Sequence, residues 1–296
     1  MNLKLKHEYN AHDGSITQIK YSKDYKHIIS SGEDGVIQIW TIDNNEFVAS
    51  MKGHMGSVNS FVTNNSDSQM ISGGTDRSLV WWDVERQADI RRLKCHDGAI
   101  NTVCLSKNLG IVFSGSTDST VQAWDNRISG NSPLSVLSDA KDAITSVSTS
   151  RYEIFTASLD GKLRMYDVRN NKLIMDDIGS PIMYIELSWD NHAVLVADSS
   201  SRIRLQTTNT GDAYQMYEGA LIENCPIKCH FASSIYKIIS GSKTGEGLIW
   251  DTKEGKLNDK IKFGEGPIVD VAANEPFTAI TLASTNGHIG IFEKED

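Results

Sequence analysis

The chain has 296 residues and a mass of 32.7 kDa, which is long enough for one large core or two ordinary domains. It holds 23 Gly but only 5 Pro, and no Pro-rich or Ser-rich linker divides it, so one continuous domain over residues 1–296 is predicted. The net charge of −9 repels phosphate backbones, which argues against direct binding of nucleic acid.

Residues 3–9, LKLKHEY, alternate in polarity and predict a short strand before a repeat begins. The repeat has a period of about 42 residues, and seven units fill the chain. The residues at the equivalent position near the end of each unit are Trp40, Trp82, Trp124, Tyr166, Gln206, Trp250 and Phe292.

Units one to three keep four residue types in register, each displaced by 42 residues from one unit to the next. These are His12, His54 and His96; Ser30, Ser72 and Ser114; Asp34, Asp76 and Asp118; and Trp40, Trp82 and Trp124. Short segments of alternating polarity, divided by Gly, Asp, Asn and Ser, predict four strands per unit. Four strands in a repeat of this length are typical of a β-propeller blade, so we predict an all-β, seven-bladed propeller.

These units resemble the WD-repeat family, strongly in units one to four and more weakly afterwards. The resemblance implies a buried relay in which the turn Asp orients the His, the His contacts the Ser, and the Ser contacts the Trp indole. In unit three the relay would comprise Asp118, His96, Ser114 and Trp124. A Ser-His-Asp set could also be a nucleophilic triad, but three copies without a nucleophile elbow favour the structural role.

Units four to seven depart from this pattern. Unit four has Ala140 where a His would be expected, and unit five has Gln206 in place of the Trp. These later blades are expected to rely on packing alone. The seventh unit ends with HIGIF and EKED and so lacks an outer strand, which residues 3–9 are predicted to supply.

A propeller offers two faces for recognition. One face holds the loops before each blade and the turns that contain the relay Asp, and we call it the relay face. Its inner ring of side chains is small and mostly neutral, and comprises Thr17, Asn59, Asn101, Thr145, Met183, Lys228 and Val269. Glu33, Lys228 and Lys243 are the charged candidates for partner binding there. Phosphopeptide capture needs converging cations, so two lysines confined to unit six do not favour a phosphopeptide reader.

The opposite face holds the turns after the first and third strands of each blade. Arg127 and Arg169 fall in equivalent turns of units three and four, and Trp189 falls in the first turn of unit five. Arg and Trp are enriched among interface anchors, so these three residues form a candidate partner patch. The alternative is that each Arg pairs with a nearby Asp and that Trp189 packs under its own loop.

No motif predicts catalysis, a cofactor or a metal, so a non-enzyme is expected. GSKTGEG at residues 241–247 lacks the ending of a phosphate loop and leads into a strand. CPIKCH at residues 225–230 offers only three of the four ligands that a structural zinc site needs.

The cysteine content and hydropathy bear on the cellular setting. No window approaches the roughly eighteen apolar residues of a membrane span, so a soluble, unsecreted protein without membrane contact is predicted. Four cysteines are too few for a disulfide framework in a chain of this size, and reduced thiols of the cytosol or nucleus are expected. They are Cys95, Cys104, Cys225 and Cys229.

A closer resemblance lies in the runs SGGTDRSLVWWDV, SGSTDSTVQAWDNR, LDGKLRMYDVR and IGSPI, which are similar to the mitogen-activated protein kinase organiser family of WD-repeat proteins. The resemblance implies a scaffold of the cytoplasm and nucleus, monomeric within larger complexes. Its expected partners are proteins of an extracellular-signal-regulated kinase cascade, or spliceosomal proteins that act in pre-mRNA splicing. Unit six departs from the family, because GSKTGEGLIW lacks the turn Asp.

Two other classes of function remain open. Paired W/Y-D-x-R boxes ending in Arg127 and Arg169 resemble the motif by which substrate receptors of cullin-type ubiquitin ligases bind their adaptor. An enzyme built on the propeller channel is the third class, and it would require a bound metal or ligand.

Overall fold

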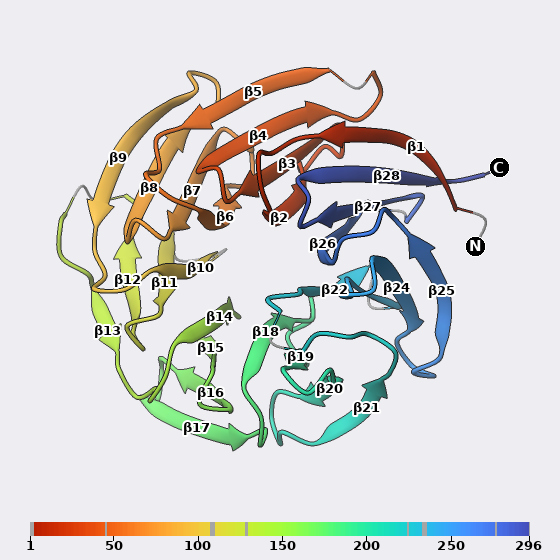
Figure 1. Cartoon of the computed structure of the whole chain (residues 1–296). Helices are drawn as coiled ribbons and strands as arrows, with labels where there is room; N and C mark the ends of the chain where they lie inside the picture. Colours follow the sequence, from red (N-terminus) through yellow and green to blue (C-terminus); the bar gives the residue numbers. More distant parts are fainter. Residues whose placement is uncertain are drawn as a thin grey trace.

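The computed structural model is a ring of seven four-stranded antiparallel sheets around a central channel, which confirms the predicted seven-bladed propeller (Figure 1). It describes residues 3–44, 46–106, 110–127, 130–223, 225–232, 236–275 and 277–295. Within these ranges the structure contains β-strands and no helix. Each blade runs from an inner strand at the channel to an outer strand at the rim.

Blades one to four take their strands in chain order, from the inner to the outer strand. They comprise β2 (Ile16–Tyr21), β3 (His27–Gly32), β4 (Val36–Thr41) and β5 (Phe47–Lys52); β6 (Val58–Thr63), β7 (Gln69–Gly74), β8 (Ser78–Asp83) and β9 (Ala88–Lys94); β10 (Ile100–Leu105), β11 (Ile111–Ser116), β12 (Val121–Asp125) and β13 (Ser135–Leu137); and β14 (Ile144–Thr149), β15 (Glu153–Ser158), β16 (Lys162–Asp167) and β17 (Lys172–Asp177).

Blades five and six follow the same order, whereas blade seven takes its outer strand from the start of the chain. They comprise β18 (Ile182–Leu187), β19 (Ala193–Asp198), β20 (Ile203–Thr207) and β21 (Ala213–Tyr217); β22 (Cys229–Ala232), β23 (Lys237–Ser240), β24 (Glu246–Asp251) and β25 (Leu257–Lys262); and β26 (Ile268–Ala273), β27 (Ala279–Ser284), β28 (His288–Lys294) and β1 (Leu3–Asn10).

The core lies between neighbouring blades, because alternate side chains of each strand face the blades on either side. One buried cluster, for example, joins Ile29 and Ile37 of blade one to Phe61 and Met70 of blade two. All six residues of β19 are buried, whereas none of the outer strand β13 is. Burial therefore falls toward the rim, where the strands carry more polar side chains.

The inner strands of all blades except blade six have a β-bulge near their first residue, as between Ile16 and Gln18 of β2. The residue inside this bulge, Thr17, donates a hydrogen bond to the backbone of the next blade. A bulge turns a side chain away from the regular alternation of a strand. In blades one to four the bulge therefore directs one polar side chain toward the neighbouring blade.

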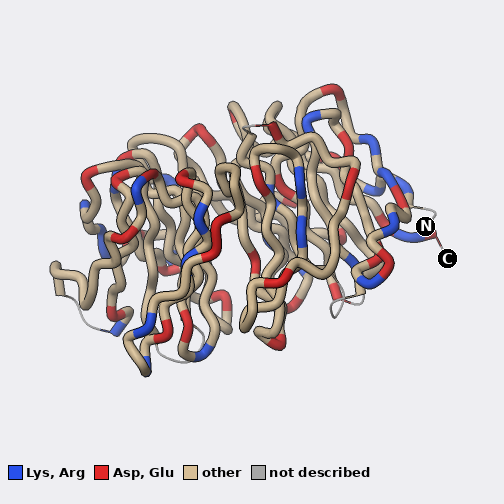
Figure 2. The backbone as a smooth tube through the Cα atoms, turned by 90° about the horizontal axis from the view of Figure 1, so that it is seen from below, with Lys and Arg blue, Asp and Glu red and all other residues tan. Residues whose placement is uncertain are grey.

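Strand β1 closes the ring, as the alternation of residues 3–9 predicts. It pairs antiparallel with β28 and so completes the last blade. Tyr9 is only 3% exposed, and its ring lies 5.1 Å from that of Trp40 in blade one. Its hydroxyl donates to the carbonyl oxygen of Thr41 over 2.9 Å, and burial raises its pKa to about 12. The two chain ends lie together at one edge of the ring, where acidic and basic residues are interspersed (Figures 1 and 2).

Removal of β1 tests this closure. A variant lacking residues 1–9 loses the buried Tyr9 ring and leaves the backbone groups of β28 unpaired. We expect its midpoint of thermal unfolding to fall by on the order of 10 °C, measured by circular dichroism.

The matched control is Lys6→Ala, which removes only the exposed 2.7 Å ion pair with Glu293. Such pairs contribute at most about 1 kcal/mol, so this variant should melt close to the native protein. A truncated chain that melts with the control would contradict the closure.

Candidate functional site

Blades two and three carry the same buried contacts on the relay face. In blade two, His54 Nδ1 lies 3.0 Å from Asp76, and His54 Nε2 lies 2.8 Å from Ser72 Oγ. Trp82 Nε1 donates to the same Ser72 Oγ over 2.8 Å. The corresponding distances in blade three are 2.8 Å for His96 to Asp118, 2.8 Å for His96 to Ser114 and 3.1 Å for Trp124 to Ser114. These side chains satisfy one another's buried polar atoms and tie each loop to its blade.

Blade one lacks the last of these contacts. His12 lies 3.0 Å from Asp34 and 2.8 Å from Ser30 Oγ, as in the other two blades. Among the residues that the structure describes, however, Trp40 Nε1 has no hydrogen-bond partner. The Trp40 ring packs against Tyr9 at the closing seam, and the expected contact from Trp40 to Ser30 is therefore wrong.

The relay has no means of nucleophilic attack. Ser30, Ser72 and Ser114 are each 0% exposed, so no substrate in solvent can reach their hydroxyl oxygens. The turn carboxylates also accept backbone N–H groups, as Asp76 does from Met55 over 3.0 Å. Burial by itself raises the pKa of Asp76, but hydrogen bonds from His54 and Met55 outweigh burial and lower it. The carboxylates are thus structural anions that hold the loops.

Blades four and five use arginine where the first three blades use histidine. Arg164, which is 1% exposed, donates to both oxygens of Asp160 over 3.1 and 2.6 Å. The fully buried Asp198 accepts Arg202 Nε at 2.9 Å and Arg204 Nη2 at 3.0 Å. The expectation that these blades rely on packing alone is wrong, because a guanidinium neutralises each buried carboxylate.

Blade six also departs from the prediction of packing alone. It has neither the His nor the Asp of the relay, yet Trp250 is fully buried. Its indole Nε1 donates to the carbonyl oxygen of Glu218 over 2.9 Å. A backbone carbonyl therefore takes the place of the serine hydroxyl.

The inner ring of the relay face latches blades together. Its side chains donate to the carbonyl oxygen of the next blade in four consecutive blades. These contacts are Thr17 to Val58, Asn59 to Ile100 at 2.9 Å, Asn101 to Ile144 at 2.8 Å and Thr145 to Ile182 at 2.8 Å. The polar groups of these four side chains therefore already have hydrogen-bond partners within the protein. The sequence alone did not predict these bonds.

The charged candidates of the relay face lie in different environments. Glu33 is exposed and accepts the backbone N–H of Ser15 over 3.3 Å. Lys243 donates to the carbonyl oxygen of Glu223 over 3.2 Å. Lys228 lies deeper in the channel than the inner ring in which the sequence places it. Its side chain is only 13% exposed and lines the central channel.

The depth of Lys228 follows from strand register. Cys229 of β22 pairs with Ser240, just as Ile19 of β2 pairs with Ser30. Lys228 therefore takes the position of Gln18 and not that of Thr17.

On the opposite face, the two arginines bind the aspartates of their own turns. Arg127 donates to both oxygens of Asp125 over 3.0 and 2.9 Å, and Arg169 donates to both oxygens of Asp167 over 3.3 and 3.2 Å. The hydrogen bonds from Arg127 lower the pKa of Asp125 to about 2. Both arginine side chains stay exposed, at 72% and 53%, so a partner can still reach them.

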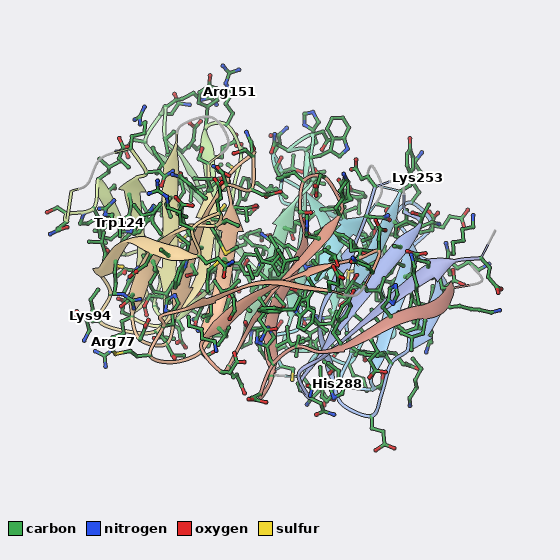
Figure 3. The ribbon with its side chains drawn as sticks, turned by 90° about the horizontal axis from the view of Figure 1, so that it is seen from above. Arg77, Lys94, Trp124, Arg151, Lys253 and His288 are labelled. Atoms are coloured by element: carbon green, nitrogen blue, oxygen red, sulfur yellow. The ribbon has the colours of Figure 1, made fainter. Side chains whose placement is uncertain are left out.

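Aromatic side chains accompany these cations. Trp189 is 68% exposed and also lines the mouth of the channel, so it does not pack under its own loop. In blade four the guanidinium carbons of Arg151 and Arg169 lie 5.0 and 4.6 Å from the Tyr152 ring centroid. In blade six Lys253 Nζ lies 5.9 Å from the Tyr236 centroid. Figure 3 places Arg151 and Lys253 on one face of the disc and Arg77 and His288 on the other.

Sequence reasoning missed these aromatic and cationic pairs. Tyr152 and Tyr236 both fall in the turn after an inner strand, as Trp189 does. Counting the aromatic residues at this turn across all seven units would have found them.

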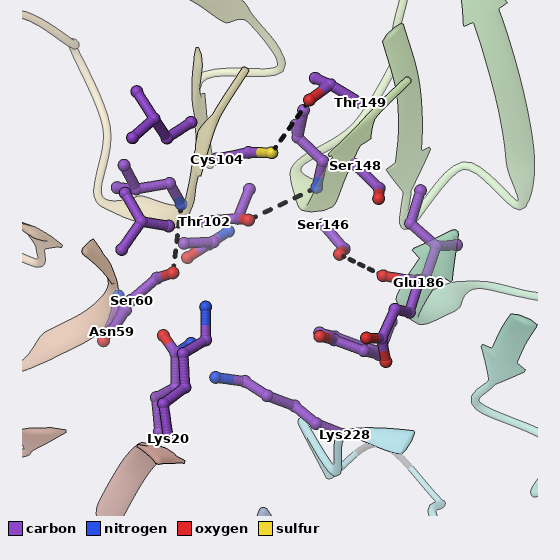
Figure 4. Close-up of a pocket in the computed structure, with 18 of the residues that line it drawn as sticks. Lys20, Asn59, Ser60, Thr102, Cys104, Ser146, Ser148, Thr149, Glu186 and Lys228 are labelled. Carbon is purple, nitrogen blue, oxygen red and sulfur yellow. Dashed lines mark hydrogen bonds between the residues drawn. The ribbon is translucent and has the colours of Figure 1, made fainter. Parts of the chain in front are cut away.

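The central channel holds a cavity of about 730 Å³ with charged groups in and behind its wall (Figure 4). His230 Nδ1 lies 2.9 Å from Glu186 Oε2, and His230 Nε2 lies 2.7 Å from Asp270 Oδ1. The other oxygen of Asp270 accepts the N–H of Ile19 over 2.9 Å. Since these residues come from blades five, six, seven and one, the series of bonds crosses the closing seam.

The cysteines and CPIKCH give no sign of a metal site. None of the four cysteines forms a disulfide, and burial raises the pKa of Cys95 to about 12 and that of Cys229 well above its usual value. Both nitrogens of His230 are occupied by carboxylates. Over the described ranges, no group of three His, Cys, Asp or Glu is placed to hold a metal ion. The same ranges include no helix long and apolar enough to cross a membrane.

Two matched serine variants test the relay. Ser72→Ala leaves both His54 Nε2 and Trp82 Nε1 without a partner, whereas Ser30→Ala strands only His12 Nε2. A buried polar group that loses its partner costs about 1–3 kcal/mol. The free energy of unfolding should therefore fall by about 1–3 kcal/mol more in Ser72→Ala than in Ser30→Ala. Urea unfolding of the two variants measures the difference, and equal losses would show that the Trp82 bond contributes nothing.

His230 predicts a pH dependence of stability. Burial by itself lowers the pKa of His230, but attraction to Glu186 and Asp270 outweighs burial and raises it from 6.5 to about 9. The folded state therefore holds this proton more tightly than the unfolded state. Its stabilisation is complete below pH 6.5 and is lost as the pH rises through 9.

We expect the free energy of unfolding of the native protein to fall by on the order of 3 kcal/mol as the pH rises through this range. His230→Gln should lack this part of the pH dependence. Urea unfolding at a series of pH values measures it. Parallel pH profiles for the two proteins would contradict the proposed protonation of His230.

Comparisons with known proteins agree with this architecture. The family model described as "Nucleolar protein 10-like, N-terminal domain" matches residues 62–254, and that described as "WD domain, G-beta repeat" matches residues 3–41. WD repeat domain-containing protein 83 of Rattus norvegicus is 30% identical over 163 residues, which are 55% of this chain and 51% of the relative. The Homo sapiens protein of the same name is 29% identical over 163 residues, with the same coverage.

An uncharacterised WD repeat-containing protein of Schizosaccharomyces pombe is 28% identical over 168 residues, which are 56% of this chain and 57% of the relative. The chain spans about half the length of the curated relatives it matches. The match over residues 62–254 covers more than half of the chain. This protein therefore belongs to the WD-repeat β-propeller family, within the group described as nucleolar protein 10-like.

Proposed function

We propose that this protein is a non-enzymatic scaffold that assembles other proteins on the face opposite the relay. The exposed Trp189 carries the proposal, because an aromatic side chain this open to solvent is a typical interface anchor. The cation and aromatic pair of Arg169 and Tyr152 on the neighbouring blade adds a second anchor. The relay serines, by contrast, are fully buried and support no reaction.

We propose further that the partners are proteins of an extracellular-signal-regulated kinase cascade or of the spliceosome in pre-mRNA splicing. The likeness of units two to four to kinase organiser proteins supports this choice, and the net charge of −9 favours protein over RNA. A location in both cytoplasm and nucleus is proposed with it, and the nucleolar name of the matching family is in keeping with a nuclear pool.

Alanine substitution at the anchor tests this function. Trp189→Ala should weaken binding of the tagged protein to purified kinase-cascade or spliceosomal components by roughly tenfold or more, since a central aromatic anchor contributes at least about 2 kcal/mol. Binding is measured by biolayer interferometry.

The control is Tyr214→Ala, which removes another exposed aromatic side chain, from the outer strand β21, and should change affinity less than about twofold. Unchanged affinity for Trp189→Ala, or native protein that binds neither class of component, would overturn the proposal.

The alternative function is that of a substrate receptor for a cullin-type ubiquitin ligase. The observation that favours it is the equivalent placement of Arg127 and Arg169 in exposed turns of adjacent blades. The double variant Arg127→Ala, Arg169→Ala separates the two functions. Loss of binding to the purified ligase adaptor would favour the alternative, whereas native protein that does not bind the adaptor would remove it.

A further inference from the structure

Two lysines from distant parts of the chain point into the same cavity of the central channel. Lys20 belongs to β2 of blade one, and Lys228 precedes β22 of blade six. Both line the cavity, and Figure 4 shows their side chains extending toward each other. Lys20 therefore repels the Lys228 ammonium, while Glu186 and Asp270 attract Lys20 without forming an ion pair with it.

The fold leaves this pair of charges incompletely neutralised. Within the described part of the chain, no carboxylate lies within ion-pair distance of Lys20, whose ammonium reaches the carbonyl oxygen of Phe61 at 3.5 Å. Lys228 Nζ lies 3.8 Å from Asp270, and that carboxylate already binds His230 and the N–H of Ile19. Burial lowers the pKa of Lys228 to about 8 against the attraction of Asp270, and repulsion by Lys20 adds a smaller lowering.

The cavity wall also offers hydroxyl donors. Ser60 Oγ accepts the N–H of Val103 over 3.2 Å, and Thr102 Oγ1 accepts that of Val147 over 3.4 Å. A hydroxyl that accepts in this way keeps its own hydrogen for another acceptor. Figure 4 shows both residues on the side of the cavity where Lys20 extends.

Like charges that face each other in a confined space are unfavourable unless an anion joins them. A cavity of about 730 Å³ is of the size that holds small organic ligands. We propose that the central channel binds a compact phosphorylated small molecule, whose phosphate lies between Lys20 and Lys228 and accepts from Ser60 and Thr102. This binding activity is separate from the proposed scaffold surface.

Calorimetric titration of the full chain with pyrophosphate and with fructose 1,6-bisphosphate, in low-salt buffer, tests the site. The native protein should bind at least one of these probes. Lys20→Met and Lys228→Met should each weaken binding by roughly tenfold, as expected for loss of a charge-assisted hydrogen bond. The control Lys253→Met removes a lysine outside the cavity and should leave the affinity unchanged.

A second readout does not depend on any ligand. Without added anion, Lys20→Met should melt at a higher temperature than the native protein, because it removes one of two facing charges. Lys253→Met should not.

Three outcomes would overturn the proposal. These are failure of the native protein to bind either probe, equal affinity in Lys20→Met, or binding of a phosphoserine peptide without binding of the small phosphates. The last would assign the cavity to a partner's phosphorylated segment.

Discussion

The pairing of β1 with β28 is the contact on which the rest of the molecule depends. A propeller blade buries its apolar side chains only against the blades beside it, so an open ring would leave two blade faces uncovered. The closing strand completes the last sheet at the rim, and Tyr9 reaches from it to blade one. Asp270 joins the same two blades inside the channel through the N–H of Ile19. The seam is therefore held at both its outer and its inner end.

A closed ring also buries polar groups beside the relay face, and the chain satisfies them in two ways. Blades one to three bring an imidazole from the preceding loop to the turn carboxylate, as His54 does for Asp76. Blade four brings a guanidinium from its own third strand, where Arg164 binds Asp160. Both solutions place a donor against a buried anion, because an unpaired carboxylate would cost more than the fold can tolerate. In both cases the turn carboxylate is paired, so it ties the turn to neighbouring side chains.

The remaining polar and aromatic groups are divided between the opposite face and the channel. On the opposite face, Trp189 and the arginine-flanked Tyr152 lie where a protein partner can reach them. In the channel, Lys20 and Lys228 face a cavity of about 730 Å³, which is of the size for a small ligand and not for a folded protein. The two surfaces meet at Trp189, which belongs to the wall of the cavity as well as to the face. A ligand in the channel would therefore lie close to the proposed protein-binding surface.

The number of blades and the closure of the ring follow from local sequence patterns. Trp40, Trp82 and Trp124 are spaced by 42 residues, and residues 3–9 alternate in polarity. Both patterns can be recognised in the sequence without knowledge of the fold. The relay partners of blades two and three were predicted through the resemblance to the WD-repeat family, on residues that keep register in the repeat. The sequence also contained the runs LDGKLRMYD and DSSSRIRLQ, but the pairing of Arg164 with Asp160 was not recognised in them.

Which polar groups have hydrogen-bond partners depends, by contrast, on how the blades pack around the ring. Thr17 and Asn59 were predicted on a ring open to solvent, yet each donates to the next blade. The sequence aligns Lys228 with Thr17, whereas in the structure it corresponds to Gln18. The difference arises because the bulge of strands such as β2 is absent from β22. The approach of Lys20 to Lys228 joins residues that are far apart in the chain, and no local pattern encodes it. Such contacts depend on how seven blades are arranged around one axis, which is a property of the ring and not of any repeat.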